Sequence, residues 1–167
     1  MLVKEKLGNI ISFPVTGKSI DYLLLNWYET NKRILHKKTM SGREISMKFL
    51  NENPQLAVGD IIFEDDESII VVDIQEADVI VIRPVNMQEM AAICYEIGNK
   101  HLPLFYQEEE ILVAYENPLF KFLQASGYKI EKAKRKLTSP IKTTVSPHST
   151  SSNSLFNRIM KLTTETE

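Results

Sequence analysis

Residues 86–102 read NMQEMAAICYEIGNKHL, and they predict a capped helix that ends in a tight turn. Asn86 is a favourable N-cap residue, and Glu89 stands at the third helical position, where its side chain completes a capping box. Apolar side chains then recur at the spacing of one helical face: Met90, Ile93, Cys94 and Ile97. A helix with such a stripe must pack that face on a core.

The end of this helix is also marked in the sequence. Gly98 and Asn99 are the residue types that best tolerate a left-handed backbone at a helix end, and Pro103 cannot continue a helix. The next strand is expected over residues 101–106. His101 is therefore expected at the start of this strand, held in place by the helix before it and the strand after it.

The C-terminal half predicts a ferredoxin-like domain. Strands are expected at Val79–Ile82, His101–Tyr106, Ile111–Tyr115 and Tyr128–Leu137. Before the last strand, Asn117 is expected to cap a second helix, with Pro118 in its first turn and Gly127 at its end. The resulting order β-α-β-β-α-β is that of the split βαβ arrangement.

Residues 1–76 predict a small all-β domain, a sandwich or a barrel, because they contain no convincing helix. Short strand patterns follow one another at Leu2–Leu7, Ile20–Trp27, Lys32–Thr39, Arg43–Phe49, Asp60–Glu64 and Ser68–Ile74. Gly42 stands where a hairpin turn needs a positive φ. The side chains of Trp27, Tyr28 and Phe49 are expected in the core of this domain.

The predicted fold class is therefore α+β. We expect an N-terminal β-rich domain over residues 1–76 that binds peptides or partners, a ferredoxin-like domain over 77–145, and a flexible tail over 146–167. The tail begins with serine, threonine and proline, which bury too little surface to offset chain entropy. Its later apolar residues would form one helical face: Leu155, Phe156, Ile159 and Met160. The tail is thus either a segment that orders against a partner or a frayed end with incidental apolar residues.

The composition is that of an ordinary globular protein, with 43% hydrophobic and 25% charged residues among 167. No apolar run approaches the roughly 18 to 20 residues that cross a bilayer, and the first residues lack the order of a signal peptide. One cysteine, Cys94, cannot form an internal disulfide. A net charge of -2 gives no reason to expect nucleic acid as a partner. We therefore expect a cytoplasmic protein without a membrane or nucleic-acid partner.

The chain has three histidines, His36, His101 and His148. His36 lies beside Lys37 and Lys38, whose charges would oppose a bound cation, so it is interpreted as structural. His101 follows a rigid helix end, but one imidazole is too few for a tight metal site. Two copies of the chain about a two-fold axis would supply two imidazoles. His148, in the tail, would then close over the ion as a further ligand.

Imidazole ligands favour Ni²⁺, Cu²⁺ and Zn²⁺, whereas Mg²⁺ and Ca²⁺ prefer oxygen. A site made of few imidazoles leaves coordination positions open, so its ion can be handed on. Metalloenzymes instead fix the ion with three or more convergent ligands. The sequence also contains no HExxH pair, CxxC pair, phosphate-binding GxxxxGK[ST] loop or GxSxG elbow. These features indicate a carrier and not an enzyme.

Residues 91–106, AAICYEIGNKHLPLFY, closely resemble the signature of the UreE family of nickel metallochaperones, which are urease accessory proteins. In that family an alanine-rich helix runs into Gly-Asn-Arg/Lys-His and an apolar strand. The resemblance extends to the hairpin with Thr39 and Gly42, to the GDIIF strand entry at Gly59, and to VSPHS at 145–149. It therefore covers nearly the whole chain.

This resemblance implies a homodimer whose nickel site is formed by His101 of both subunits, with His148 as an auxiliary, labile ligand. Residues 77–145 would bind the metal and form the dimer. The resemblance also implies delivery of Ni²⁺ to the urease apoprotein through a complex with the accessory GTPase UreG. Zn²⁺ and Cu²⁺ fit the same site, and the pairing of two dimers around one ion stays open.

Two features depart from the family pattern. Lys100 stands where arginine is common, and a single tail histidine replaces the polyhistidine tract of many members, so storage of several ions is not implied. The alternative is a metal-independent adaptor, in which the β-rich domain and the tail hold partner proteins and His101 packs at an interface. RNA binding by the βαββαβ domain is disfavoured, because its strands lack the paired aromatic pattern of RNA-binding sheets.

Overall fold

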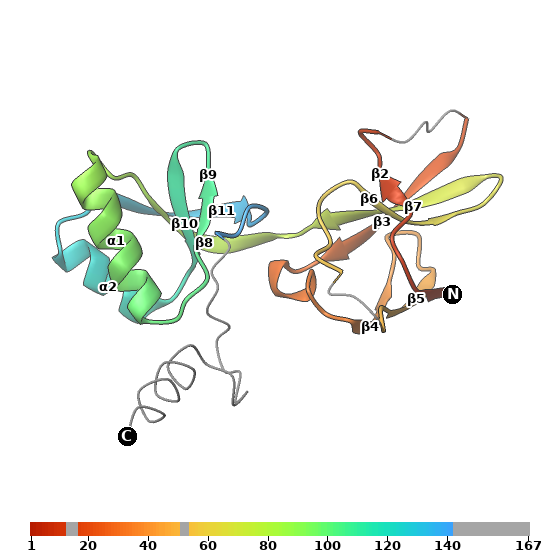
Figure 1. Ribbon diagram of the computed structural model, residues 1–167, viewed down its shortest axis with the longest axis horizontal. Coiled ribbons are helices and arrows are strands. Elements are labelled where there is room, and N and C mark those ends of the chain that lie inside the picture. Colours follow the sequence, from red (N-terminus) through yellow and green to blue (C-terminus); the bar gives the residue numbers. More distant parts are fainter. Residues whose placement is uncertain (13–16, 51–53, 142–167) are drawn as a thin grey trace, which may run out of the picture.

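The computed structural model describes residues 1–12, 17–50 and 54–141. It consists of an N-terminal β domain and a C-terminal α+β domain, which Figure 1 shows at opposite ends of an elongated molecule. The nearly continuous strands β7 (Ser68–Ile74) and β8 (Glu76–Ile82) join the two. The predicted α+β fold class is confirmed.

Two sheets build the N-terminal domain, with the strand orders β1-β5-β4 and β2-β6-β7-β3. The remaining strands are β1 (Leu2–Val3), β2 (Gly8–Asn9), β3 (Ser19–Leu25), β4 (Ile34–Lys38), β5 (Glu44–Lys48) and β6 (Asp60–Glu64). Alternating side chains of both sheets point inward, and one buried cluster contains residues of both sheets, among them Leu23, Ile45, Met47 and Ile70. The domain is therefore a small sandwich, as predicted. Gly42 has the positive φ, +89°, that the β4–β5 turn requires.

A buried carboxylate ties this hairpin to the other sheet. Asp21 is 7% exposed and accepts hydrogen bonds from the Ser41 amide at 3.1 Å, the Ser41 hydroxyl at 2.5 Å and Arg43 Nε at 3.0 Å. Burial alone would raise the pKa of Asp21, but the hydrogen bonds from Ser41, Thr39 and Arg43 outweigh it and lower the pKa to about 2. Asp21 is therefore an ionised group that joins the two sheets.

The strand predicted at Ile20–Trp27 is shorter than expected. It ends at Leu25, because the Asn26 amide donates to Glu29 Oε2 at 2.8 Å and starts a short 3-10 turn, η1 (Trp27–Glu29). The strand predicted at Leu2–Leu7 likewise covers only its first two residues. Phe49 lies in the core of the domain as expected. Trp27 and Tyr28 do not, because the η1 turn directs Trp27 toward the C-terminal domain and leaves Tyr28 exposed.

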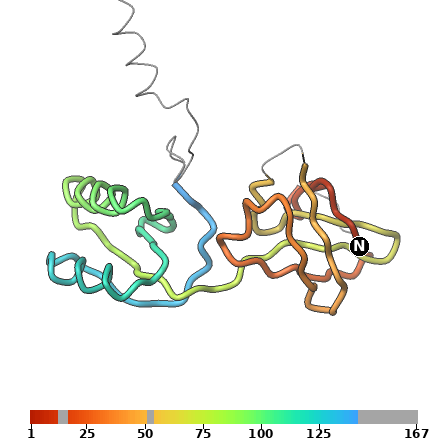
Figure 2. Tube along the Cα trace, turned by 90° about the horizontal axis from the view of Figure 1, so that it is seen from below, coloured from red at the N-terminus to blue at the C-terminus, as the bar shows by residue number. Residues whose placement is uncertain are grey.

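The C-terminal domain has the predicted β-α-β-β-α-β order. Its elements after β8 are α1 (Met87–Asn99), β9 (Phe105–Gln107), β10 (Glu110–Ala114), α2 (Asn117–Ala125) and β11 (Ile130–Lys136). The antiparallel sheet has the order β11-β8-β10-β9, and both helices cover one of its faces (Figure 2). The centre of β8, residues 79–82, is a continuous apolar run buried on both faces.

Two helix boundaries differ from the prediction. The cap of α2 is Glu116, whose side chain makes no capping hydrogen bond, and Asn117 is the first helical residue. The helix α1 runs through Gly98 and Asn99, and the left-handed residue after it is His101, with φ +56°. The following strand begins at Phe105 and not at His101. Residue preference alone favoured Gly98 and Asn99 for the left-handed position. The packing of the apolar residues that follow fixed where the helix ends.

The second face of this sheet is covered by the chain that follows β11. Leu137 is 2% exposed, and Thr138 donates two hydrogen bonds to the Gln107 side chain. The segment ends beside β9, where the Ile141 amide donates to the Leu104 carbonyl at 2.7 Å. We call residues 137–141 the strap. The half-buried Trp27 packs on the same sheet face, 5.5 Å from Phe105 between ring centroids.

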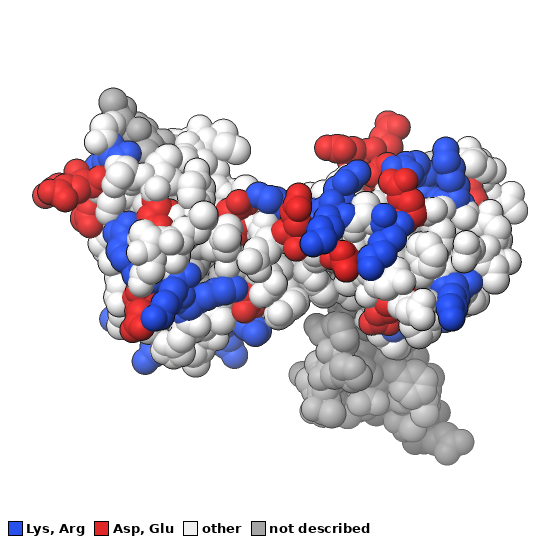
Figure 3. Space-filling model, turned by 180° about the vertical axis from the view of Figure 1, so that it is seen from behind, with Lys and Arg blue, Asp and Glu red and all other residues white. Residues whose placement is uncertain are grey.

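Basic and acidic side chains are interspersed over the face shown in Figure 3. No large region of one sign stands out on that face. Among the described residues, no helix is long and apolar enough to span a membrane.

Candidate metal centre

The end of helix α1 holds His101 in a defined turn. The His101 amide donates to the Gly98 carbonyl at 2.9 Å, and the Leu102 amide reaches the Ile97 carbonyl at 3.5 Å. This pair of bonds is the Schellman arrangement, in which the residue after the cap adopts a left-handed conformation. Here that residue is His101, with φ +56°.

Glycine usually occupies this position, because the left-handed region costs an L-residue roughly 1 to 2 kcal/mol. A histidine at this position therefore destabilises the turn locally, and the packing around the turn must offset this destabilisation. The side chain of Leu102 packs against the cluster beneath the helices, and Pro103 follows directly. The backbone of His101 is thus fixed on both sides, while its imidazole is exposed to solvent.

The neighbouring lysine is held by the second helix. Lys100 Nζ lies 4.6 Å from the centre of the Phe122 ring on α2, within the range of a cation–π contact. This contact connects the ends of the two helices. It also gives the ammonium group of Lys100 a partner other than the imidazole next to it in sequence.

One chain does not complete a metal site around His101. Among the described residues, no three histidine, cysteine, aspartate or glutamate side chains gather where they could hold an ion. His148 lies outside the described residues. The chain leaves the described part at Ile141, which is hydrogen-bonded to Leu104, three positions after His101.

Helix α1 presents an apolar surface to solvent on the side away from the sheet. Met87 is 81% exposed and Tyr95 is 69% exposed, and Ala91 between them is also exposed. A spacing of four residues places these three on one side of the helix. We call them the α1 face. It extends along the helix that ends at His101.

The other candidate ligands have structural partners. His36, in β4, has its Nδ1 atom 2.8 Å from the Ser46 hydroxyl across the hairpin. Cys94 is half-buried with its sulfur 4.0 Å from that of Met90, and burial raises the pKa of its thiol. A protonated thiol facing the core is a poor metal ligand. Both residues fit the structural interpretation made from the sequence.

Comparison with protein families covers both domains. Residues 3–75 match the model of the UreE urease accessory protein, N-terminal domain, and residues 77–152 match that of the C-terminal domain.

The chain belongs to the UreE family of urease accessory proteins.

Individual UreE proteins are similar along most of their length. The urease accessory protein UreE of Flavobacterium johnsoniae is 47% identical over 163 residues, which is 97% of this chain and 99% of that protein. UreE of Haemophilus influenzae is 39% identical over 84% of this chain and 78% of its own length. UreE of Helicobacter pylori is 37% identical over 89% and 90% of the two chains. Membership in the UreE family makes this chain an accessory chaperone protein and not an enzyme.

The structure also reveals long-range contacts of the segment that follows His101, which the sequence did not indicate. The strap brings Ile141 to Leu104, and the η1 turn brings Trp27 to Phe105. These contacts join residues far apart in the chain of this UreE protein. No local pattern of charge, periodicity or turn residues marks them, so only the folded chain identifies them.

Proposed function

We propose that this UreE-family protein carries Ni²⁺ and delivers it to apo-urease during assembly of the urease active site. The observation that supports the proposal most directly is the single imidazole of His101, exposed on a rigid left-handed turn. A fixed backbone presents a ligand at low entropic cost, while solvent exposure leaves a route for the ion to depart.

The proposed carrier is a homodimer. The α1 face offers an exposed apolar surface for a second copy, and a two-fold axis near the end of α1 would bring the two His101 side chains together. In this arrangement residues 77–145 bind the metal and form the dimer, while residues 1–76 hold partner proteins. Two such dimers can share one ion if each contributes its pair of imidazoles.

His148 is the proposed auxiliary ligand. It follows Ile141 by seven positions, and a chain of that length reaches at most roughly 25 Å when fully extended. Because Ile141 is anchored to Leu104, the tail starts close to the turn that carries His101. His148 from either subunit is therefore within reach of an ion bound there.

Imidazole chemistry favours the proposed cargo but does not restrict it to one metal. Ni²⁺, Zn²⁺ and Cu²⁺ all accept neutral imidazole, and their supply in the cell decides which one is loaded. Two to four nitrogen ligands leave positions open for an incoming ligand from the acceptor. The proposed acceptor is the complex of the urease apoprotein with the accessory GTPase UreG. The proposed transfer takes place in the cytoplasm.

The test is nickel binding by the full chain, measured by equilibrium dialysis. About one tightly held ion per dimer is expected, and His101→Ala should abolish it. His36→Ala is the matched control, because His36 is also exposed but bonded to Ser46. Nickel affinity that is unchanged in His101→Ala would refute the proposed site, and a protein that takes up no nickel would favour the adaptor alternative.

His148 has a separate role in the proposal and a separate test. His148→Ala should weaken nickel binding or alter the number of ions bound, and the variant should remain a dimer. A variant as impaired as His101→Ala, or one that dissociates into monomers, would contradict this division between a primary and an auxiliary ligand.

A further inference from the structure

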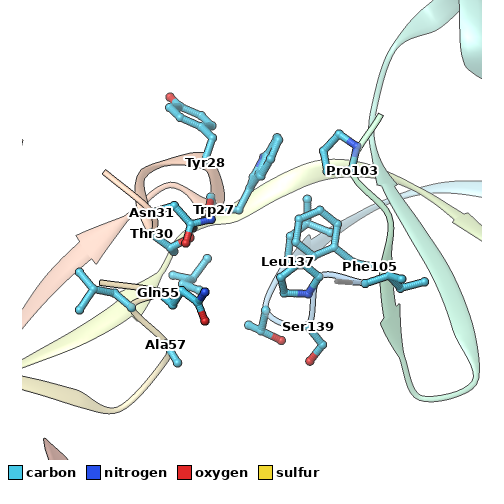
Figure 4. Close-up of a pocket in the computed structure, with 15 residues that line it drawn as sticks. Trp27, Tyr28, Thr30, Asn31, Gln55, Ala57, Pro103, Phe105, Leu137 and Ser139 are labelled. Carbon is cyan, nitrogen blue, oxygen red and sulfur yellow. Dashed lines mark hydrogen bonds between the residues drawn. The ribbon is translucent and has the colours of Figure 1, made fainter. Parts of the chain in front are cut away.

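A cavity of about 630 Å³ lies between the two domains. One wall belongs to the N-terminal domain and the other to β9 and the strap, and Figure 4 shows Trp27, Gln55 and Ala57 facing Phe105, Leu137 and Ser139 across it. We call this cavity the interdomain groove. It begins close to the proposed metal centre, since Pro103, two positions after His101, lines it.

The groove carries no charge, and its lining is partly apolar and partly polar. Its aromatic and aliphatic lining includes Trp27, Tyr28, Leu56, Ile74, Phe105 and Ile141. Uncharged polar side chains also line it, namely Thr30, Asn31, Gln55, Thr138 and Ser139, and none of the lining residues carries a charge. Tyr28 is 55% exposed and Ile141 is 41% exposed, so apolar surface is open to solvent at its edge. Such a groove suits a segment with apolar side chains, and it offers no charged group to pair with a phosphate, a carboxylate or a metal ion.

The chain itself supplies a segment of this kind. It leaves the described part at Ile141, which is a groove residue, and residues 155–160 read LFNRIM. Leu155, Phe156, Ile159 and Met160 share the helical face defined by their spacing. The basic residue in this segment, Arg158, belongs to the other side.

We propose that residues 155–160 bind in the interdomain groove of their own chain. Residues 142–154 join Ile141, which lines the groove, to this segment, and a connection of that length spans at most roughly 45 Å when extended. Tethering raises the local concentration of the segment to the millimolar range, which favours it over a free peptide of equal affinity.

Docking has a consequence for the metal centre that rests on the proposed function. His148 lies between Ile141, fixed in the strap, and Leu155, fixed in the groove. Both anchors hold it near the His101 turn, so docking should strengthen nickel binding through His148. Nickel binding should then strengthen docking by the same factor by which docking strengthens nickel binding, because such coupling is reciprocal.

Trp27 is the only tryptophan of the chain and lines the groove, so its fluorescence reports on the occupant directly. The test uses the full-length, metal-free protein. The double variant Phe156→Ser with Ile159→Ser should shift the Trp27 emission to longer wavelength and increase its quenching by acrylamide. The matched control, Arg158→Ser with Lys161→Ser, should leave both unchanged.

A second measurement tests rescue. A synthetic peptide of residues 152–164, added to the Phe156→Ser, Ile159→Ser protein, should return the emission toward that of the unaltered chain. The proposal is overturned if the double variant has the emission and quenching of the unaltered chain, or if the peptide has no effect. An emission that changes on dilution would place the segment on a second copy and would also overturn it. None of these readouts uses nickel, so failure of the proposed carrier function would be recognised separately.

Discussion

At the scale of single residues, His101 shows a conflict between local backbone preference and its proposed role as a metal ligand. The Schellman turn requires a left-handed residue where glycine would be least strained, and the chain places an imidazole there. The sequence placed His101 at a helix end but assigned the left-handed positions to Gly98 and Asn99. Residue preference could not resolve the exact position, because the burial of Leu102 decides it.

We expect His101→Gly to be more stable than His101→Ala by about 1 kcal/mol, since only glycine relieves the left-handed strain. The free energy of unfolding of the metal-free proteins, from urea titration, measures this difference. Both variants should lose nickel. Equal stability of the two would show that the turn does not impose the strain seen at φ +56°.

Asp21 gives a prediction for pH. Its pKa is lowered from 3.8 to about 2 in the folded protein, so the unfolded chain takes up the proton first. The stabilisation is complete above about pH 5 and is lost as the pH falls toward 2, amounting to about 2 kcal/mol. Asp21→Asn should flatten the pH dependence of the unfolding free energy in this window. Asp66→Asn, in an exposed turn, is the control, and an unaltered pH profile in Asp21→Asn would contradict the assignment.

At the scale of elements, α1 has two apolar sides with different roles. The side formed by Ile93 and Ile97 is fully buried on the sheet, as the periodicity predicted. The opposite α1 face keeps Met87 and Tyr95 exposed, and it is the surface proposed above for a second copy of the chain. The sequence predicted the buried side because helical spacing is local. It could not show that the other side stays uncovered within one chain.

Tyr95→Asp should convert the proposed dimer to monomers, because a carboxylate buried at an apolar interface is costly unless it is paired. Mass measurement by light scattering during gel filtration would detect the change. Gln124→Asp, at an exposed position of α2, is the control and should leave the mass unchanged. A Tyr95→Asp protein that remains dimeric would place the subunit contact on another surface.

At the scale of the whole molecule, the contact of Trp27 with Phe105 joins the two domains. Their rings meet edge to face at an interplanar angle of 81°, and Trp27 packs on the sheet face beneath the strap. We expect Trp27→Ala to uncouple the domains, so that calorimetry resolves two unfolding transitions in place of one. Met40→Ala, which removes a 68% exposed side chain, should leave a single transition. One transition in both variants would show that β7 and β8 suffice to couple the domains.

The sequence by itself determined the α+β class, the order of the C-terminal elements, the buried side of α1 and the turn at Gly42. These follow from spacing and turn chemistry, which act over a few residues. The tertiary structure alone decided that His101 takes the left-handed position, that the strap crosses the sheet to Leu104, and that Trp27 leaves its own core for Phe105. Such contacts depend on which distant surfaces remain to be buried once the local elements have formed.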